Sequence, residues 1–148
     1  MPRTEILVDA EREVVFEVLT DAESYGEWVV GSRGVRGVDP KWPRPGGRFH
    51  HTVGWVGPVT VKDHTEVEDI DPPRSIVLRV KTRPWMVGRV ELYVKPEDDG
   101  RTRVIMHEST VGGLATQAGS VALGLPLWGR NTESLRRLKR IAESRAAH

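Results

Sequence analysis

The hydrophobic and polar positions along this chain follow two different periods. Between Arg48 and Val111 they alternate with a period of two, which is typical of β-strands that bury one face. The turn-forming sequences GWVGP, DIDPPR, TRPW and PEDDG divide this region at the spacing expected of an antiparallel meander. The predicted strands are Arg48–Trp55, Val59–Ile70, Ser75–Thr82, Val87–Lys95 and Arg101–Val111.

Two shorter strands and a helix are predicted in the first part of the chain. The strands are Glu5–Val8 and a short one near Val35–Val38, which brings the expected sheet to about seven strands. The sequence AEREVVFEVL has helical spacing up to Leu19, and we expect the carboxylate of Asp9 to cap this helix.

A second short helix and a rigid loop follow. Thr20 and Glu23 in TDAE have the spacing of a capping box, so we expect a helix through Tyr25 to about Trp28. The sequence DPKWPRPGG at Asp39–Gly47 is rich in proline and glycine, and it predicts a surface loop between strands.

The C-terminal part of the chain returns to helical spacing. Because the meander leaves one apolar surface, we expect this long helix to pack on the concave side of a curved sheet. The segment Gly112–Pro126 before it is expected to form the movable edge of a cavity mouth. The apolar side of the helix is formed by Trp128, Asn131, Leu135, Leu138 and Ala142.

These elements predict a single α+β domain over residues 1–148, and the composition narrows its role. Lys and Arg number 22 against 21 Asp and Glu, so the charge balance favours neither nucleic acid nor an anionic membrane as partner. The lack of cysteine excludes a disulfide framework, a thiolate metal site and a cysteine nucleophile. The acidic N-terminal sequence predicts a cytoplasmic protein, and no apolar run is long enough for an integral membrane segment.

The sequence also contains no nucleophile motif, phosphate-binding loop or cluster of metal ligands. His50, His64 and His107 fall on the strand faces opposite to the apolar ones and lack the short spacings of a zinc site. We therefore predict no metal and no cofactor. The tryptophans are expected to pack in the core or at a pocket rim rather than to stack on nucleic-acid bases.

The order of elements, with several local motifs, resembles the SRPBCC superfamily, which includes START and pollen-allergen-like proteins, and in particular its polyketide cyclase/dehydrase-type members. The motifs are VDAEREVVFEVLTDAESYGEW, GGRFHH, EVEDIDPPRSIVLRV, DGRTRVIM and RNTESLRRLKRIAE. This resemblance covers nearly the whole chain and implies a helix-grip fold. It implies little about chemistry, because the superfamily holds cyclases, hydrolases, lipid carriers and hormone receptors.

Strand alternation and the helix pattern define the residues expected to line a dry, mainly apolar cavity between the sheet and the terminal helix. Apolar walls with a few polar groups are the pattern expected of a site for a small molecule. The predicted lining residues are Phe49, Val53, Val61, Thr65, Leu78, Val80, Gly88, Val90, Leu92, Met106, Trp128 and Asn131.

Three titratable residues interrupt the inner face and are the candidates for catalysis. If the turn centres near Gly57, His51 and Asp63 lie opposite each other, either as a structural pair or as a pair for proton transfer. A hairpin centred on Asp98 and Asp99 would place Glu108 opposite Gly88, where the glycine leaves room.

These observations leave three functions open. The first is binding of a small, largely apolar ligand such as a lipid, a polyketide or an aromatic metabolite. The second is an enzyme of the polyketide cyclase, aromatase or dehydratase kind, in which His51, Asp63 or Glu108 transfers protons. The third is a module that binds another protein through the terminal helix and the segment before it. The sequence also leaves open whether the protein forms a homodimer.

Overall fold

The computed structural model of the chain describes residues 3–29, 32–56, 59–82, 86–112 and 120–147. Within these ranges the side chains are described except at residues 32–34, 51–56, 59–63, 82, 86, 110–112 and 120–130.

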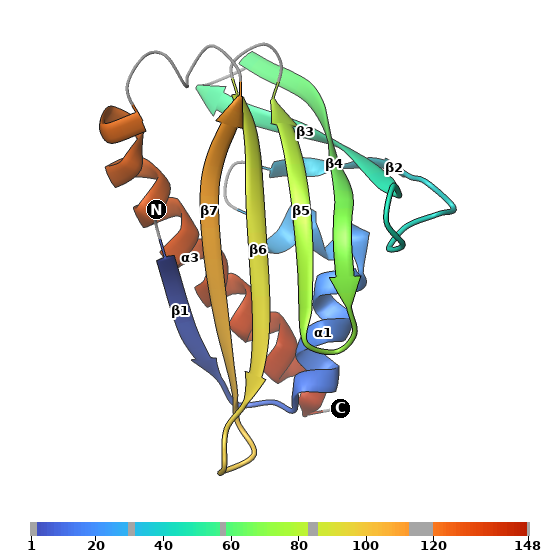
Figure 1. Cartoon of the computed structure of the whole chain (residues 1–148), viewed down its shortest axis with the longest axis vertical. Helices are drawn as coiled ribbons and strands as arrows, with labels where there is room; N and C mark the ends of the chain where they lie inside the picture. The colour runs from blue at the N-terminus through green and yellow to red at the C-terminus, as the bar shows by residue number, and fades with distance from the viewer. Residues whose placement is uncertain (1–2, 30–31, 57–58, 83–85, 113–119, 148) are drawn as a thin grey trace.

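The chain forms one antiparallel sheet of seven strands in the order β1-β7-β6-β5-β4-β3-β2 (Figure 1). All neighbours except β1 and β7 are consecutive in sequence, as expected of a meander. The predicted α+β fold with seven strands is therefore confirmed. The strands are β1 (Arg3–Val8), β2 (Ser32–Val38), β3 (Arg48–Val56), β4 (Val59–Asp71), β5 (Ser75–Thr82), β6 (Met86–Pro96) and β7 (Thr102–Gly112).

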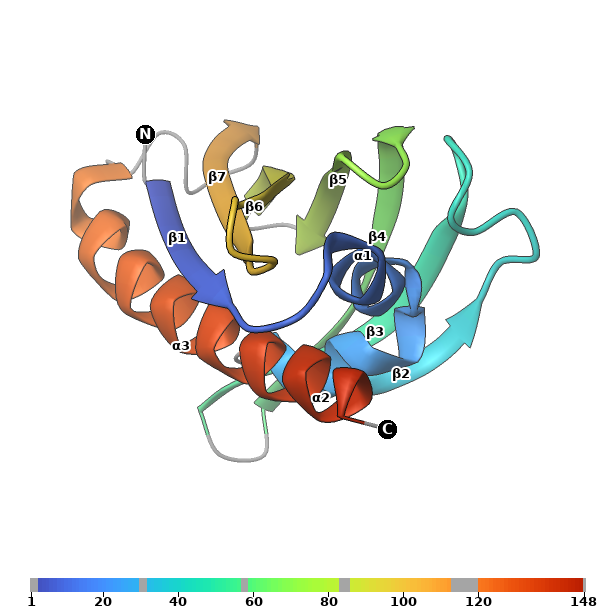
Figure 2. The same cartoon turned by 90° about the horizontal axis from the view of Figure 1, so that it is seen from below.

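The helices lie on the concave side of this sheet (Figure 2). After β1 come α1 (Arg12–Thr20), the 3-10 turn η1 (Ala22–Ser24) and α2 (Tyr25–Trp28), and the chain ends in the long helix α3 (Ser120–Ala146). Because the alternating strands have a single apolar face, α1, α2 and α3 must all cover that face. This is the helix-grip arrangement that the sequence predicts.

Helix α3 supplies the part of the core that closes the concave face. Leu135, Leu138 and Ala142 have no exposed surface, as expected from their spacing on one side of a helix. They belong to the same apolar cluster as Val8 of β1 and Leu19 of α1. One core therefore joins the first strand, β1, to the last helix, α3.

Two predicted helix caps are wrong. Asp9 is not the N-cap of α1, because two residues separate it from the first helical residue. The N-cap is Glu11, whose side chain makes no capping hydrogen bond. The backbone amide of Asp9 instead donates to Oε2 of Glu143 on α3 at 2.7 Å, which fastens the end of β1 to the terminal helix. The hydroxyl of Thr20, at the end of α1, donates to the carbonyl of Glu17 rather than capping the next turn.

The start of the terminal helix also differs from expectation. Helix α3 begins at Ser120, so the part of the predicted loop Gly112–Pro126 from Ser120 onward is helical and includes Pro126. A helix is hard to recognise in this part because Gly124 and Pro126 are both unfavourable inside helices. The predicted mobility of the segment at the cavity mouth stays a prediction.

An aromatic cluster fixes α2 and the loop before β3 against the sheet. The ring of Tyr25 lies 4.7 Å from that of Trp28 and 4.8 Å from that of Phe49, measured between centroids. Trp42, in the predicted Pro- and Gly-rich loop, contacts Phe49 edge-on at 4.9 Å. The buried Tyr25 hydroxyl donates to the carbonyl of Leu19 at 2.6 Å, which satisfies its polar end. The prediction that tryptophans pack in the core is confirmed for Trp28 and Trp42.

Replacing Leu138 by alanine should destabilise the protein strongly, because Leu138 has no exposed surface and α3 closes the core. We expect a loss of roughly 2 to 5 kcal/mol in the free energy of unfolding, measured by urea denaturation. Arg136→Ala, two residues away on the exposed side of α3, is the matched control and should change this free energy by less than about 0.5 kcal/mol. Equal effects of the two substitutions would contradict the assigned helix face.

Tyr25 should make the protein less stable in alkali. Burial, and secondarily the charge of Asp21, raises the pKa of the Tyr25 phenol above its usual value near 10. Above that pH the unfolded chain loses the Tyr25 proton while the folded chain keeps it, so the free energy of unfolding falls as the pH rises. Above about pH 10, Tyr25→Phe should flatten this fall by up to about 1.4 kcal/mol per pH unit, and the two proteins should differ little in slope near pH 8, as measured by urea titrations between about pH 8 and pH 11.

The half-buried Tyr93 provides the comparison for this measurement, because it is the only other tyrosine of the chain. Partial burial and a hydrogen bond to Glu91 also raise the pKa of Tyr93. Tyr93→Phe should flatten the alkaline fall less than Tyr25→Phe does, and the reverse order would count against the assigned burial of Tyr25.

Candidate functional site

The concave face of the sheet consists of rows of side chains that pair across neighbouring strands. One row runs from β3 to β6 through Phe49, Thr65, Val80 and Gly88. The next row runs from β4 to β7 through Val67, Leu78, Val90 and Glu108. A third row includes Ile76, Leu92 and Met106 and ends on β1 at Thr4. Most of the predicted lining residues therefore occupy adjacent rows of one face.

Burial decreases along this face toward the end where β5 and β7 finish and β6 begins (Figure 1). Ile76 and Leu92 are at most 1% exposed, as expected in a close-packed core. Val80, Val90 and Glu108 are only half-buried, although they point to the same side. This end of the concave face therefore retains accessible surface, and it is the candidate ligand-binding site.

A hydrogen bond between the sheet and α3 places polar groups at this end. The side-chain amide of Asn131 donates to Oε2 of Glu108 on β7 at 2.6 Å. Asn131 is only 7% exposed, so this bond satisfies a donor that would otherwise be costly to bury. Because the acceptor is a carboxylate, the bond is of the stronger, charge-assisted kind.

The structure thus brings together two of the predicted polar residues. Helix α3 runs without a break through Pro126 and Asn131. Glu108 lies on the inner face as predicted, but its partner on the neighbouring strand is Val90 rather than Gly88.

The error in the Glu108 register comes from the turn between β6 and β7. The ladder ends at Pro96 and Thr102, so the five residues 97–101 form the turn, with the amide of Glu97 donating to the carbonyl of Arg101 at 2.8 Å. Gly100 adopts a positive φ of 83°, which permits this longer turn. The observed ladder is centred on Asp99, whereas a pairing of Glu108 with Gly88 would be centred on Asp98. Moving the turn centre by one residue shifts the pairing by two residues, one full strand period, so every side chain keeps its predicted face.

The predicted pairing of His51 with Asp63 agrees with the backbone. The two residues are direct partners in the ladder of β3 and β4, in the row next to that of Phe49 and Thr65. Their side chains lie outside the described residues, so a contact between them stays a prediction.

Several lining predictions cannot be placed beyond the backbone. Val53 and Val61 are direct partners across β3 and β4, and Trp128 lies within α3. Their side chains also belong to the parts that the structure does not describe, and the predicted dry cavity depends on them. Phe49, by contrast, is buried in the aromatic cluster, which makes it a wall of the core beneath the site.

Two further buried polar residues, not predicted from the sequence, lie on the same side. Thr4 of β1 has a buried hydroxyl with no hydrogen-bond partner in the structure, and it pairs with Met106. Thr4 has the same strand parity as Ile6 and Val8, which predicts an inward side chain. It was not predicted because the expected strand began at Glu5, one residue after Thr4. Ser134 is 4% exposed and follows Asn131 by one helical turn, a spacing that could have identified it.

The outward histidines behave as their strand positions predict. The rings of His50 and His64 lie 6.0 Å apart on neighbouring strands, and the ring of His107 lies 6.0 Å from that of Tyr93. Within the described parts of the chain, no group of three or more His, Asp or Glu residues could hold a metal ion. None of the described helices combines the length and apolar character needed to cross a membrane.

The fold and its inner face define a helix-grip protein of the α+β class, and comparisons with known proteins identify the family. The chain belongs to the family described as polyketide cyclase/dehydrase and lipid transport, whose profile matches residues 3–143. The predicted kinship with polyketide cyclase/dehydrase-type members of the SRPBCC superfamily is thereby confirmed. No curated protein matches the sequence of this chain.

Solved structures of distant sequence share the fold. Zhui aromatase/cyclase from Streptomyces sp. R1128 is 19% identical with a TM-score of 0.76, over 97% of this chain and 93% of that chain. Protein SA2116 of unknown function from Staphylococcus aureus is 11% identical with a TM-score of 0.74, over 99% and 96% of the two chains. The di-domain ARO/CYC StfQ of the steffimycin biosynthetic pathway is 16% identical with a TM-score of 0.72, over 99% of this chain and 51% of that chain.

A double-mutant cycle should show that Glu108 and Asn131 are coupled. Asn131→Ala removes the donor to a half-buried carboxylate, so we expect a loss of about 1 to 3 kcal/mol in the free energy of unfolding. The variant that also carries Glu108→Ala should be less destabilised than the sum of the single changes, by at least about 0.5 kcal/mol. The half-exposed pair Arg137 and Glu133 on α3 is the control and should couple more weakly. Additive effects at Glu108 and Asn131 would contradict the hydrogen bond.

Proposed function

We propose that this protein binds a small, largely apolar ligand between α3 and the half-buried end of the concave face. The observation that carries the proposal is the hydrogen bond between Asn131 and Glu108, which places a carboxylate and an amide beside otherwise apolar rows. Sites for small molecules combine apolar walls, which supply affinity, with few polar groups, which orient the ligand. The family description, which names polyketide cyclases, dehydrases and lipid transport, supports this class of ligand.

The polar pair indicates which ligand group is recognised. Asn131 engages one oxygen of Glu108, and the other oxygen still has lone pairs to accept a hydrogen bond from a ligand hydroxyl. The amide oxygen of Asn131 can accept a second one. The site therefore favours an apolar molecule with one or two hydroxyl groups over a plain hydrocarbon, and over an anion, which Glu108 would repel.

A second candidate function is catalysis of an aldol cyclisation of a poly-ketone. In that reaction a base removes a proton next to one ketone, and the resulting carbanion attacks a second ketone and closes the ring. The alkoxide so formed takes up a proton, and loss of water then leaves a double bond in the ring. The pairing of His51 with Asp63, on strands next to the apolar rows, favours this candidate because a carboxylate can orient an imidazole as the base. Glu108 would hold the hydroxyl that forms. The aromatase/cyclases among the structural neighbours support the same reading.

The binding proposal predicts a preference for hydroxylated aromatic ligands. Wild-type protein should bind 2-naphthol about tenfold more tightly than naphthalene, because the hydroxyl donates to the Glu108 carboxylate. Glu108→Gln should reduce this ratio to about two or less, since a neutral amide oxygen is the weaker acceptor. Dissociation constants can be measured by displacement of the neutral fluorescent probe N-phenyl-1-naphthylamine.

Glu91→Gln is the matched control, because Glu91 is also half-buried on the sheet but points to the opposite face. It should leave the ratio of the two affinities unchanged. Equal binding of 2-naphthol and naphthalene by the wild-type protein would remove Glu108 from the site. Native mass spectrometry of the purified protein would then still test whether any small apolar molecule is carried.

A further variant, His51→Ala, separates carriage from catalysis. If the protein is a cyclase, His51→Ala should abolish ring formation from a poly-β-ketone thioester analogue, followed by absorbance of the aromatic product, while binding of N-phenyl-1-naphthylamine is kept. If the protein is a carrier, the wild-type protein should bind the analogue without accelerating its cyclisation.

A further inference from the structure

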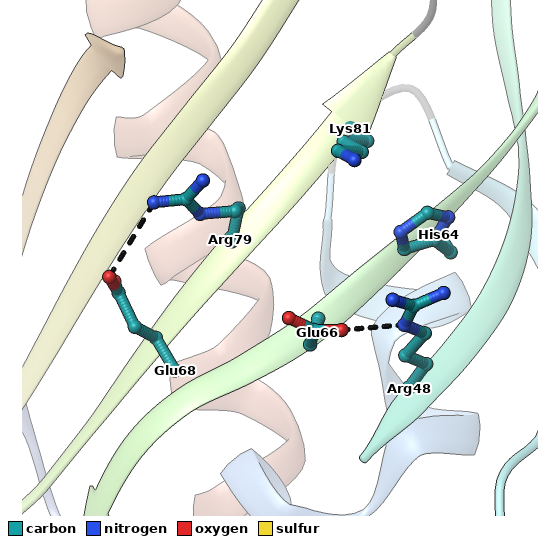
Figure 3. Close-up of a pocket in the computed structure, with 6 residues that line it drawn as sticks. All are labelled: Arg48, His64, Glu66, Glu68, Arg79 and Lys81. Atoms are coloured by element: carbon teal, nitrogen blue, oxygen red, sulfur yellow. Dashed lines mark hydrogen bonds and ion pairs between the residues drawn. The ribbon is translucent and has the colours of Figure 1, made fainter. Parts of the chain in front are cut away.

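The outer face of the sheet carries a hollow that is separate from the candidate site on the concave face. It has a volume of about 310 Å³, at the lower end of the range for small-molecule pockets. Figure 3 shows its side chains projecting from β3, β4 and β5, with the helices behind the sheet. It is lined by Arg48, His64, Glu66, Glu68, Arg79 and Lys81.

The alternation of the strands explains why charged residues gather there. In β4 and β5 the buried residues Thr65 and Leu78 point to the core, so their neighbours His64 and Arg79 point outward. Pairing across the strands places these outward residues in two rows. One row is Arg48, Glu66 and Arg79, and the other is His50, His64 and Lys81.

The two carboxylates of the hollow are already engaged by arginines. Nε of Arg48 lies 2.6 Å from Glu66, and Nε of Arg89 lies 2.7 Å from Glu68. The hydrogen bond from Arg89 is the main reason that the pKa of Glu68 lies below its usual value. Neither carboxylate is therefore left to neutralise a further cation in the hollow.

Lys81 supplies an excess positive charge at one end. Among the described residues, no carboxylate lies within ion-pair distance of its ammonium group, and its row contains no acidic residue. Arg79 contacts Glu68 only at 3.6 Å, longer than a hydrogen bond. Because Arg89 holds the same carboxylate more closely, Arg79 can turn toward a ligand without leaving Glu68 unpaired.

We propose that this hollow binds a phosphate monoester, with Lys81 and Arg79 contacting the phosphate. Lysine offers a point charge to a phosphate and arginine offers a planar pair of donors, so the two together suit a dianion better than a single cation does. The volume leaves room for an organic group beyond the phosphate. Such a group can belong to a soluble molecule or to a lipid headgroup, and both present the same phosphate chemistry.

Isothermal titration calorimetry with phenyl phosphate tests the soluble source at constant ionic strength. We expect saturable binding to the wild-type protein, weakened about tenfold by Lys81→Gln and at least about fivefold by Arg79→Gln. Lys95→Gln is the matched control, because it removes another outward lysine of the sheet that lies outside the hollow. It should change the dissociation constant by less than about twofold.

Sedimentation with vesicles tests the lipid source. Binding to vesicles that contain phosphatidic acid, but not to pure phosphatidylcholine, with loss in Lys81→Gln and not in Lys95→Gln, would support the phosphate site with a headgroup as its source. The proposal is overturned if neither phenyl phosphate nor phosphatidic acid binds. It is equally overturned if Lys81→Gln and Lys95→Gln weaken binding alike, since net charge alone would then explain the effect. Urea denaturation of each variant confirms that it is folded.

Discussion

The burial of one side of α3 against the concave face of the sheet is the contact on which the rest of the structure depends. A seven-stranded meander with alternating residues has a single apolar face, and water must be kept from it. Leu135, Leu138 and Ala142 do this together with α1 and α2. The bond from the Asp9 amide to Glu143 then ties the first strand to the last helix, so the two ends of the chain stabilise one core.

The same burial makes the Glu108 and Asn131 pair informative. A polar residue on the buried side of α3 costs free energy unless it finds a partner, and an apolar residue at position 131 would avoid that cost. The charge-assisted hydrogen bond from Asn131 to Glu108 offsets this free energy. It lies at the end of the concave face where Val80 and Val90 are only half-buried. A polar pair at the edge of an apolar core is what a site requires if it must orient a molecule as well as enclose it.

Strand alternation was sufficient to predict the faces of the sheet, because the period of two is independent of the turn. It did not determine the register, since the turn at residues 97–101 depends on the conformation of Gly100, and Glu108 therefore pairs with Val90. The pairing of His51 with Asp63 agrees with the predicted turn centre near Gly57, although the irregularity between Gly54 and Val56 contributes to this register. Cap positions were not predictable, because Asp9 finds its partner on α3, far away in the sequence. Contacts of that kind arise only from the tertiary fold.

The two candidate sites share the same strands, and this limits how each can change. Leu78 and Val80 face the concave site, while Arg79 and Lys81, their neighbours in β5, face the charged hollow. A slip of one residue in β5 would exchange the two sets and place charges in the core, so the buried side fixes the geometry of the exposed side. The regular alternation is interrupted at the bulge between Val67 and Asp69. There Glu68 contacts both Arg79 and Arg89. The buried face thus fixes the backbone positions of Arg79 and Lys81. The ion pairs on the outer face can change their partners only among residues at these fixed positions.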